Sequence, residues 1–276
     1  MAVIEVCPLT GVIGAEIHGV DLREDLDDAT VAEIRAALDA HLVIFFLDQQ
    51  IETADHLRFA RKFGEITINP FGPKHPDHQE VSVLDQTTPK GEGADAWHTD
   101  NTYLEKPPLG SILRAVQLPA VGGDTLWANM YTAYEAFSPT MQRFLDGLTA
   151  VHDLTRMLTI ARSNGQATEA IDDMQKQYPP QRHPVVRTNP VTGRKALFVS
   201  RNWVSRIEGL TERENEVLKP FLFDHQRDPM FQCRFSWRPG SMAFWDNRWA
   251  QHYAVPDYTG ERRIMQRITI AGDPVV

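Results

Sequence analysis

The stretch Phe231–Asp246 reads FQCRFSWRPGSMAFWD and holds two runs of apolar and aromatic residues around the pair Pro239-Gly240. Alternating apolar residues predict β-strands, and a Pro-Gly pair predicts a tight turn between them. A further strand is expected at about residues 262–270, near the C-terminal end. Because these strands meet at short turns, the second half of the chain favours an antiparallel β-sandwich or barrel.

Helices are expected to decorate this β-rich half. Asp28 is predicted to cap a helix that runs to about residue 40. The pair Ser138-Pro139 predicts a second helix start, with serine as the cap and proline at the first position. Thr211 with Glu214 predicts a third start, as a capping box. The expected fold class is therefore mainly β with flanking helices (α+β).

The composition restricts the partners of this chain of 276 residues. Its formal net charge of −9 argues against nucleic acid, which needs a basic face. The two cysteines, Cys7 and Cys233, form no disulfide framework, and no signal peptide is recognisable. The most apolar run, Leu42–Leu47, is too short to span a bilayer. We expect a cytoplasmic protein without a membrane or nucleic-acid partner, in which a local basic pocket can still bind a small anion.

The tetrapeptide Trp97–Asp100, WHTD, places a histidine and a carboxylate two residues apart. On a β-strand, residues i and i+2 point to the same face, so His98 and Asp100 can hold one metal ion between them. A surface ion pair or a small turn is the alternative explanation of this pattern. A metal site needs at least one further ligand.

His252 is the strongest candidate for that ligand, because it follows an apolar strand in the stretch WDNRWAQHYAVPDY. Two imidazoles and one carboxylate leave three octahedral positions open, as in non-haem Fe(II) oxygenases. A chelating cosubstrate with a second carboxylate needs a cation for that group, and Arg263 can supply a bidentate fork. The hydroxyl of Thr125 can add a hydrogen bond. The alternative for Arg263 and Arg267 is a solvated pair on an edge strand.

These motifs, in this order, resemble the taurine dioxygenase and aryloxyalkanoate (2,4-D) dioxygenase family of Fe(II)- and 2-oxoglutarate-dependent oxygenases. The resemblance rests on WHTD, on GGDTLWANM with AYEAFSP, on HPVVRTNPVTGRKALFV and on WDNRWAQHYAVPDYTGERRIMQR. It extends to PLTGVIGAEIHGVDL near the N-terminus and so covers nearly the whole chain. An H-x-D motif alone has little specificity, whereas the ordered set is highly specific.

The resemblance implies a double-stranded β-helix, a cupin-like jelly roll with flanking helices, in one catalytic domain over residues 1–276. It implies that Thr125 and Arg263 hold the distal carboxylate of 2-oxoglutarate, and that O2 is the third reactant. The implied ligands of Fe(2+) are His98, Asp100 and His252.

The implied reaction hydroxylates a small organic acid while 2-oxoglutarate is converted to succinate and CO2. The expected substrate is an alkyl or aryl sulfonate, either taurine or a larger analogue. A sulfate ester or an aryloxyalkanoate is the alternative. Arg267 matches the position that faces the acidic group of the substrate in taurine-cleaving members.

The other substrate-binding positions depart from the taurine-specific pattern. Those members have a histidine where this chain has Asn69, and a tyrosine near Gly72. Asn101 replaces an apolar residue, and Leu158 and Trp203 stand where aromatic lining is usual. We therefore expect taurine to be a poor substrate and a larger organic acid to fit better.

Three further expectations accompany this assignment. The polar segment 155–180 is predicted to be a lid over the pocket, or else a plain surface insertion. A homo-oligomer, a dimer or a tetramer, is expected by resemblance. The rival functions are a zinc hydrolase, which can use the same three ligands with water, and a non-catalytic metal-binding protein.

Overall fold

The computed structural model describes residues 4–87, 96–163 and 168–275. Its largest element is an eight-stranded sheet in the order β1-β2-β3-β14-β6-β16-β4, with β5 also paired to β16. The neighbours are antiparallel except for β2 and β3. The strands are β1 (Glu5–Pro8), β2 (Ala15–His18), β3 (Val43–Phe46), β4 (Ile66–Thr67), β5 (Ser82–Gln86), β6 (Gly110–Gln117), β14 (Met242–Asp246) and β16 (Arg263–Ile270).

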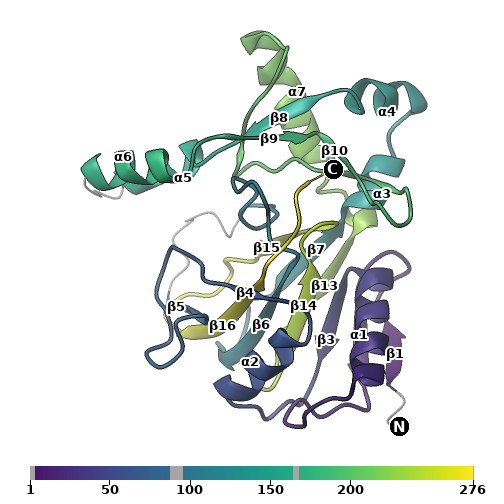
Figure 1. The fold of residues 1–276 in the computed structure, drawn as a ribbon, viewed down its shortest axis with the longest axis vertical. Helices are drawn as coiled ribbons and strands as arrows, with labels where there is room; N and C mark the ends of the chain where they lie inside the picture. The colour runs from purple at the N-terminus through teal and green to yellow at the C-terminus, as the bar shows by residue number, and fades with distance from the viewer. Residues whose placement is uncertain (1–3, 88–95, 164–167, 276) are drawn as a thin grey trace.

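A second sheet faces the first across a shared apolar core (Figure 1). It consists of β13 (Gln232–Phe235), β7 (Thr125–Asn129) and β15 (Ala250–Ala254), all antiparallel. Phe45 of the large sheet stacks on Phe235 of the small one, with ring centroids 4.1 Å apart. Two sheets packed in this way form the jelly-roll core, and the predicted fold, mainly β with flanking helices, is confirmed.

The opposite face of the large sheet is covered by α1 (Asp28–His41) and α2 (Thr53–Arg61) (Figure 1). Every residue of β3 is buried, because Ile44 and Phe46 pack under the helices while Val43 and Phe45 enter the jelly-roll core. A strand buried on both faces reads as a continuous apolar run rather than an alternating one. This burial explains why the stretch LVIFFL shows no polar positions.

A second layer stands beyond one end of the jelly roll, in the upper part of Figure 1. Its sheet has the order β12-β8-β9, and a separate hairpin pairs β10 with β11. These strands are β8 (Thr149–His152), β9 (Gln181–Pro184), β10 (Val186–Thr188), β11 (Lys195–Leu197) and β12 (Val204–Ile207). The helical elements are α3 (Met130–Glu135), α4 (Pro139–Leu145), α5 (Thr155–Ser163), α6 (Thr168–Gln177), α7 (Glu212–His225) and the short 3-10 turn η1 (Pro229–Phe231).

The predicted helix starts agree with the structure at two of three places. Thr211 and Glu214 form the expected capping box of α7, with the Thr211 amide donating to Glu214 Oε2 at 2.7 Å. Ser138 caps α4 as predicted. The Asp28 cap was wrong by one residue, because Asp27 keeps an extended backbone and its carboxylate accepts the Thr30 amide at 2.7 Å.

The polar segment 155–180 contains α5 and α6, which the sequence did not predict. The two helices project to one side of the second layer (Figure 1). Residues 164–167, which belong to the predicted lid, lie outside the described residues. Within the described ranges, no helix combines the length and the apolar character needed to cross a bilayer.

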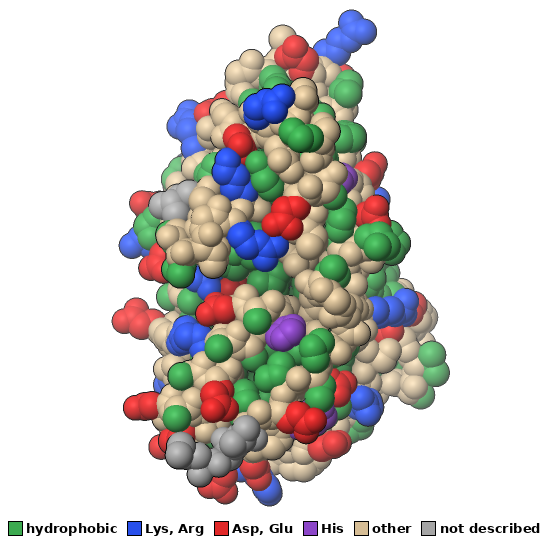
Figure 2. Space-filling view, turned by 90° about the vertical axis from the view of Figure 1, so that its right-hand side faces the viewer, with side chains coloured by type: hydrophobic (Ala, Val, Ile, Leu, Met, Phe, Trp, Pro, Cys, Tyr) green, Lys and Arg blue, Asp and Glu red, His purple; other side chains and the backbone are tan. Residues whose placement is uncertain are grey.

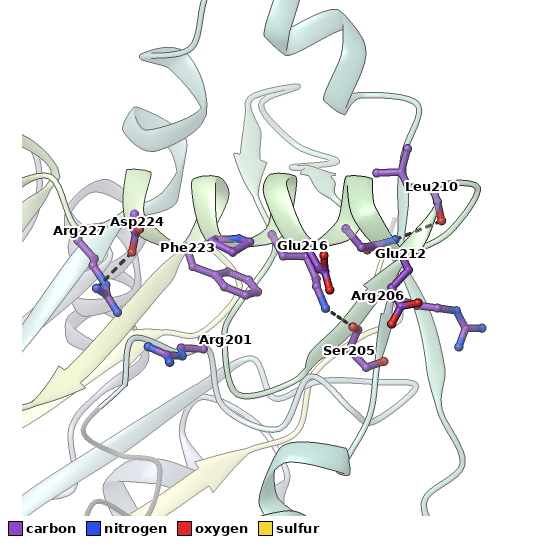
Figure 3. Close-up of a pocket in the computed structure, with 12 residues that line it drawn as sticks. Arg201, Ser205, Arg206, Leu210, Glu212, Glu216, Phe223, Asp224 and Arg227 are labelled. Carbon is purple, nitrogen blue, oxygen red and sulfur yellow. Dashed lines mark hydrogen bonds and ion pairs between the residues drawn. The ribbon is translucent and has the colours of Figure 1, made fainter.

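Acidic and basic side chains are interspersed on the face seen in Figure 2, which carries no basic stripe. A groove of about 860 Å³ runs along α7 (Figure 3) and is lined by none of the residues singled out from the sequence. Its polar groups hold α7 in place. The Lys219 ammonium donates to the carbonyl of Ser205, and the Asn215 amide donates to the carbonyl of Ile207.

Candidate metal centre and adjoining sites

A backbone bridge brings the two candidate histidine ligands together. The His98 amide donates to the carbonyl of His252 at 3.1 Å, and the His252 amide donates back to the carbonyl of His98 at 2.9 Å. His252 lies in β15, so the WHTD stretch runs alongside the edge strand of the small sheet. The imidazole ring centroids are 4.2 Å apart as a result.

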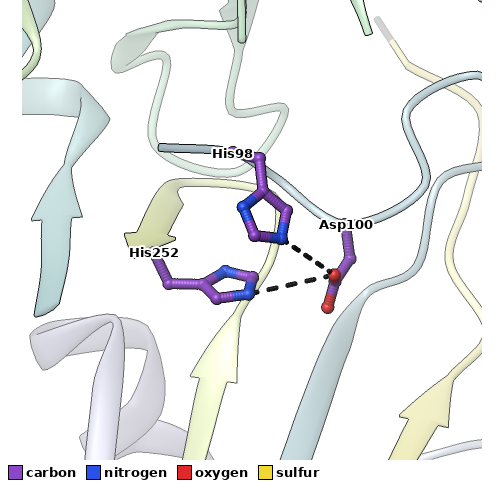
Figure 4. Close-up of side chains that lie close together, drawn as sticks. All are labelled: His98, Asp100 and His252. Carbon is purple, nitrogen blue, oxygen red and sulfur yellow. Dashed lines mark ion pairs between the residues drawn. The ribbon is translucent and has the colours of Figure 1, made fainter. Parts of the chain in front are cut away.

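Asp100 completes a buried cluster with these histidines (Figure 4). Its Oδ1 lies 3.6 Å from His98 Nε2 and 3.9 Å from His252 Nε2. One donor atom from each residue lies within 4.8 Å of the others, a spacing that could hold a metal ion. Two imidazoles and a carboxylate, grouped in this way in the described part of the chain, suit a divalent transition metal.

Electrostatics keep two of the three ligands in their metal-binding forms. Burial by itself raises the pKa of Asp100, but Arg267 and then His252 and His98 outweigh it, so the pKa lies well below its usual range. Burial, with His98 nearby, lowers the pKa of His252 to about 3, although the charge of Asp100 opposes this. At neutral pH the carboxylate is ionised and the His252 imidazole is neutral, as ligation requires.

Hydrogen bonds orient the cluster, and the sequence did not predict most of the residues that form them. Asn247 accepts the Asp100 amide at 2.7 Å and donates to the carbonyls of Asp100 at 3.0 Å and Pro108 at 3.2 Å. Ser111 donates to Asp100 Oδ2 at 3.1 Å. His98 Nδ1 lies 2.7 Å from the carbonyl of Ala96, which makes it the protonated nitrogen and leaves Nε2 for a metal. Asn247 lies inside the quoted WDNR stretch, but its role depends on contacts distant in the sequence.

Thr125 and Arg263 meet at Trp237, which the sequence did not single out. Trp237 Nε1 donates to the Thr125 hydroxyl at 3.0 Å, and the Arg263 guanidinium carbon lies 6.0 Å from the centroid of the Trp237 ring. Arg263 is buried, and its Nε has no hydrogen-bond partner among the described residues. A buried guanidinium with an unpaired donor suits an anionic ligand.

Gly123 allows Arg263 to reach this position. A β-carbon at Gly123 would lie 3.0 Å from both Cδ and Nε of Arg263, closer than ordinary carbon contacts allow. Its φ of 75° also lies in the left-handed region that favours glycine. The GGDTLW motif therefore supplies Thr125 and, through Gly123, the space that the Arg263 side chain occupies.

Three of the candidate substrate residues, Arg267, Leu158 and Trp203, contact Asp100 or residues close to it in the chain. Arg267 Nη1 donates to Asp100 Oδ1 at 3.1 Å. Leu158 and Trp203 belong to an apolar cluster with Tyr103, and Trp203 Nε1 donates to the carbonyl of Thr99 at 2.7 Å.

The two candidate asparagines differ in their surroundings. Asn101 is buried directly after Asp100 with a φ of 51°. Asn69 is half-buried, and its side-chain oxygen accepts the Phe71 amide two residues later at 3.0 Å. That bond engages the side-chain oxygen of Asn69 in a local turn.

Tyr103 adds a polar group to this apolar cluster. Its hydroxyl is buried without a hydrogen-bond partner among the described residues, and its ring centroid lies 5.0 Å from that of Trp203. Burial, followed by the nearby Tyr178 and Asp100, raises the pKa of Tyr103 above its usual range. The hydroxyl is therefore a neutral donor or acceptor next to Asp100.

Comparison with known proteins agrees with this geometry. The family model described as "Taurine catabolism dioxygenase TauD, TfdA family" matches residues 5–269. An α-ketoglutarate-dependent sulfate ester dioxygenase of Pseudomonas putida is 38% identical and aligns over 98% of this chain and 90% of its own length. These matches span almost the whole chain, as the resemblance in the motifs predicted.

Solved structures give the same result. A taurine dioxygenase from Burkholderia xenovorans has a TM-score of 0.84 and 39% identity, covering 99% of this chain and 91% of that one. The protein AAD-2, solved with Mn(II) and N-oxalylglycine, has a TM-score of 0.85 and 26% identity, covering 99% and 100%. The resemblance seen in the sequence is confirmed: the chain belongs to the TauD, TfdA family of dioxygenases.

Proposed function

We propose that this protein is an Fe(II)- and 2-oxoglutarate-dependent dioxygenase that hydroxylates a small organic acid. The observation that carries the proposal is the buried cluster of His98, Asp100 and His252, in which both Nε2 atoms point towards one carboxylate oxygen (Figure 4). This donor set is the facial triad of non-haem Fe(II) oxygenases, and it leaves room for a chelating cosubstrate and O2. Bound iron supplies the oxygen chemistry that couples decarboxylation of 2-oxoglutarate to hydroxylation.

Arg263 and Thr125 would hold the distal carboxylate of 2-oxoglutarate. The unpaired Nε of Arg263 and the Thr125 hydroxyl lie around the same Trp237 ring. N-Oxalylglycine, present in the AAD-2 structure, has the outline of 2-oxoglutarate with NH in place of one CH2 group. A simple zinc hydrolase has no use for a buried cation at this place, which disfavours that rival.

The substrate would be an acid with an apolar body larger than taurine. Arg267 offers a cation beside Asp100, and Tyr103, Leu158 and Trp203 offer an apolar wall next to it. Asn69 uses its side-chain oxygen in its own turn, and Gly72 has no side chain, so neither position reproduces the histidine and tyrosine expected in taurine-specific members. An alkyl or aryl sulfonate, a sulfate ester or an aryloxyalkanoate fits this description. Hydroxylation of a carbon that bears sulfonate, sulfate or an aryl ether yields an unstable product that collapses to a carbonyl compound and the leaving group.

A substrate panel coupled to succinate formation tests the proposal. The purified protein with Fe(II), 2-oxoglutarate and O2 is expected to form succinate with a larger sulfonate, sulfate ester or aryloxyalkanoate, and to use taurine poorly. Fast sulfite release from taurine at low concentration would end the substrate proposal. Anaerobic addition of Fe(II) and 2-oxoglutarate should give a weak visible charge-transfer band, which a zinc hydrolase or a non-catalytic binder would lack.

The proposal also covers the domain organisation, the oligomeric state and the location of the protein. We expect one catalytic domain over residues 1–276, a homo-oligomer of two or four chains and a cytoplasmic location. Sedimentation of the purified protein measures the oligomeric state. A single unfolding transition by calorimetry, with van't Hoff and calorimetric enthalpies equal, is the expected result for one domain.

A further inference from the structure

Lys74 and Arg267 are both paired with Ser82, which lies between them in the sheet. Lys74 forms an isolated antiparallel bridge with Ser82, and Ser82 of β5 is paired with Arg267 of β16. Directly opposed residues of antiparallel strands point to the same face of a sheet. The side chains of Lys74, Ser82 and Arg267 therefore leave the sheet on the same face. Arg267 uses that face to reach Asp100.

The Lys74 ammonium is anchored close to the apolar cluster. Its Nζ donates to the carbonyls of Phe71 and Gly72, each at 2.8 Å. The Phe71 ring in turn lies 6.2 Å from the Tyr103 ring and 5.7 Å from the Tyr178 ring, measured between centroids. These contacts hold the positive charge at the border between the apolar wall and Arg267.

Lys74 lacks a counter-ion in the described part of the chain. None of the ion pairs found within 4.0 Å includes it, whereas Arg267 already shares Asp100. An ammonium has three donors, and two carbonyls leave one of them for a ligand. Burial, and then the charge of Arg267, lowers the pKa of Lys74 below its usual value. Lys74 and Arg267 are therefore two neighbouring cations, and the ammonium of Lys74 keeps one free donor. An anion placed between them would stabilise both.

We propose that Lys74 determines substrate specificity by forming, with Arg267, a two-cation receptor for a tetrahedral sulfo group. This inference rests on the proposed function, because it concerns the acidic group of the same substrate. A planar carboxylate has two oxygens, and the fork of one arginine can occupy both. A sulfonate or a sulfate ester has a third oxygen out of that plane, which a compact ammonium approaching from the neighbouring segment at Lys74 can contact. The receptor therefore favours sulfonates and sulfate esters over carboxylates.

The test compares three probes of similar length: hexanesulfonate, hexyl sulfate and heptanoate. Lys74→Met should raise KM for the two sulfo compounds by about tenfold, and for heptanoate by less than about threefold. Lys74→Arg should retain most of the preference, and the KM for 2-oxoglutarate should not change. Lys62→Met is the matched control, because Lys62 pairs with Asp25 at 2.6 Å outside the proposed receptor. An equal factor for all three probes, or no effect, overturns the proposal.

Calorimetric titration separates this inference from the proposed function. The three probes are titrated into protein with Fe(II) and 2-oxoglutarate under anaerobic conditions, and into protein without them. Tighter binding of the sulfo compounds that Lys74→Met abolishes supports the receptor even if no succinate forms, in which case only the proposed reaction fails. If the wild-type protein forms succinate but prefers heptanoate to the two sulfo compounds, the receptor is refuted and the proposed reaction stands. Thermal unfolding of each variant verifies that the fold is retained.

Discussion

His98 and His252 are joined by two backbone hydrogen bonds, so their pairing does not depend on their side chains. His252→Ala should therefore keep the strand pairing and lose a metal ligand. We expect metal affinity to fall by at least about a hundredfold, with a small change in Tm. Metal analysis after dialysis and a thermal melt measure these two effects.

His18→Ala is the control for that experiment. His18 is partly exposed and pairs with Glu16 at 3.3 Å, away from the cluster. It should leave metal content and 2-oxoglutarate consumption as in the wild type. If His252→Ala also left both untouched, the proposed metal centre would be refuted.

Asn247→Ala should weaken both the fold and the metal site. The substitution removes the partner of the buried Asp100 amide and of two carbonyls. We expect a loss of roughly 2–4 kcal/mol in the free energy of unfolding and a loss of about tenfold to a hundredfold in metal affinity. Urea unfolding without metal and a metal titration measure the two losses.

Ser111→Ala is the milder comparison, since it removes one donor to Asp100 Oδ2. Its loss of unfolding free energy should be about 1 kcal/mol. Equal unfolding free energies for the two variants would show that the hydrogen bonds from Asn247 to the backbone do not stabilise the fold.

Arg263→Gln should weaken 2-oxoglutarate binding by roughly two orders of magnitude, because a buried charged hydrogen-bond donor is lost. The KM for 2-oxoglutarate and the visible band of the anaerobic complex measure this. Arg262→Gln is the neighbouring control. Arg262 points away and pairs with Asp85 through its Nε at 2.9 Å. Similar losses in both variants would contradict the assignment of Arg263.

Trypsin tests whether α5 and α6 close over the site. Arg162 at the end of α5 and Lys176 near the end of α6 are exposed cleavage points. If the helices act as a lid, Fe(II), 2-oxoglutarate and a substrate should slow cleavage at both residues, because Leu158 and Tyr178 contact the apolar cluster. Cleavage after exposed Arg23 should continue at the same rate. Unchanged cleavage at Arg162 and Lys176 favours a plain surface insertion.

His56 should make the protein sensitive to acid. Burial, with Arg114 nearby, lowers the pKa of His56 to about 3, below its ordinary value of 6.5. The unfolded state therefore binds a proton first, so the contribution of His56 is complete above about pH 6.5 and is lost as the pH falls towards 3. At pH 4.5 this loss amounts to roughly 2–3 kcal/mol.

His56→Leu measures that contribution. Between pH 7 and pH 4.5, the variant should lose roughly 2–3 kcal/mol less unfolding free energy than the wild type in urea titrations. His152 and His252 also have lowered pKa values through burial, so part of the acid sensitivity should remain. Parallel curves for variant and wild type would mean that His56 is not buried uncharged.

The sequence predicted the features that depend on residues close together in the chain and missed those that depend on distant contacts. Strand alternation, the Thr211 capping box and the order of the motifs depend on neighbours within a few residues, so the pattern alone reveals them. The helices in 155–180 were missed because this segment is polar and because few of its described side chains are buried. In the described part of α5 only Leu158 is buried. An apolar stripe of that size gives little periodic signal.

The sequence by itself determined the candidate chemistry: two histidines and a carboxylate as the proposed metal ligands, an arginine and a threonine as the proposed binding groups for a cosubstrate, and a β-rich scaffold to hold them. Only the tertiary structure decided that Asn247 orients Asp100, that Trp237 contacts both Thr125 and Arg263, and that Lys74 lies in register with Arg267. Each of these relationships joins different segments of the chain that strand pairing and packing bring together. Strand register is set by pairing and core packing between distant segments, and a linear pattern does not contain that information.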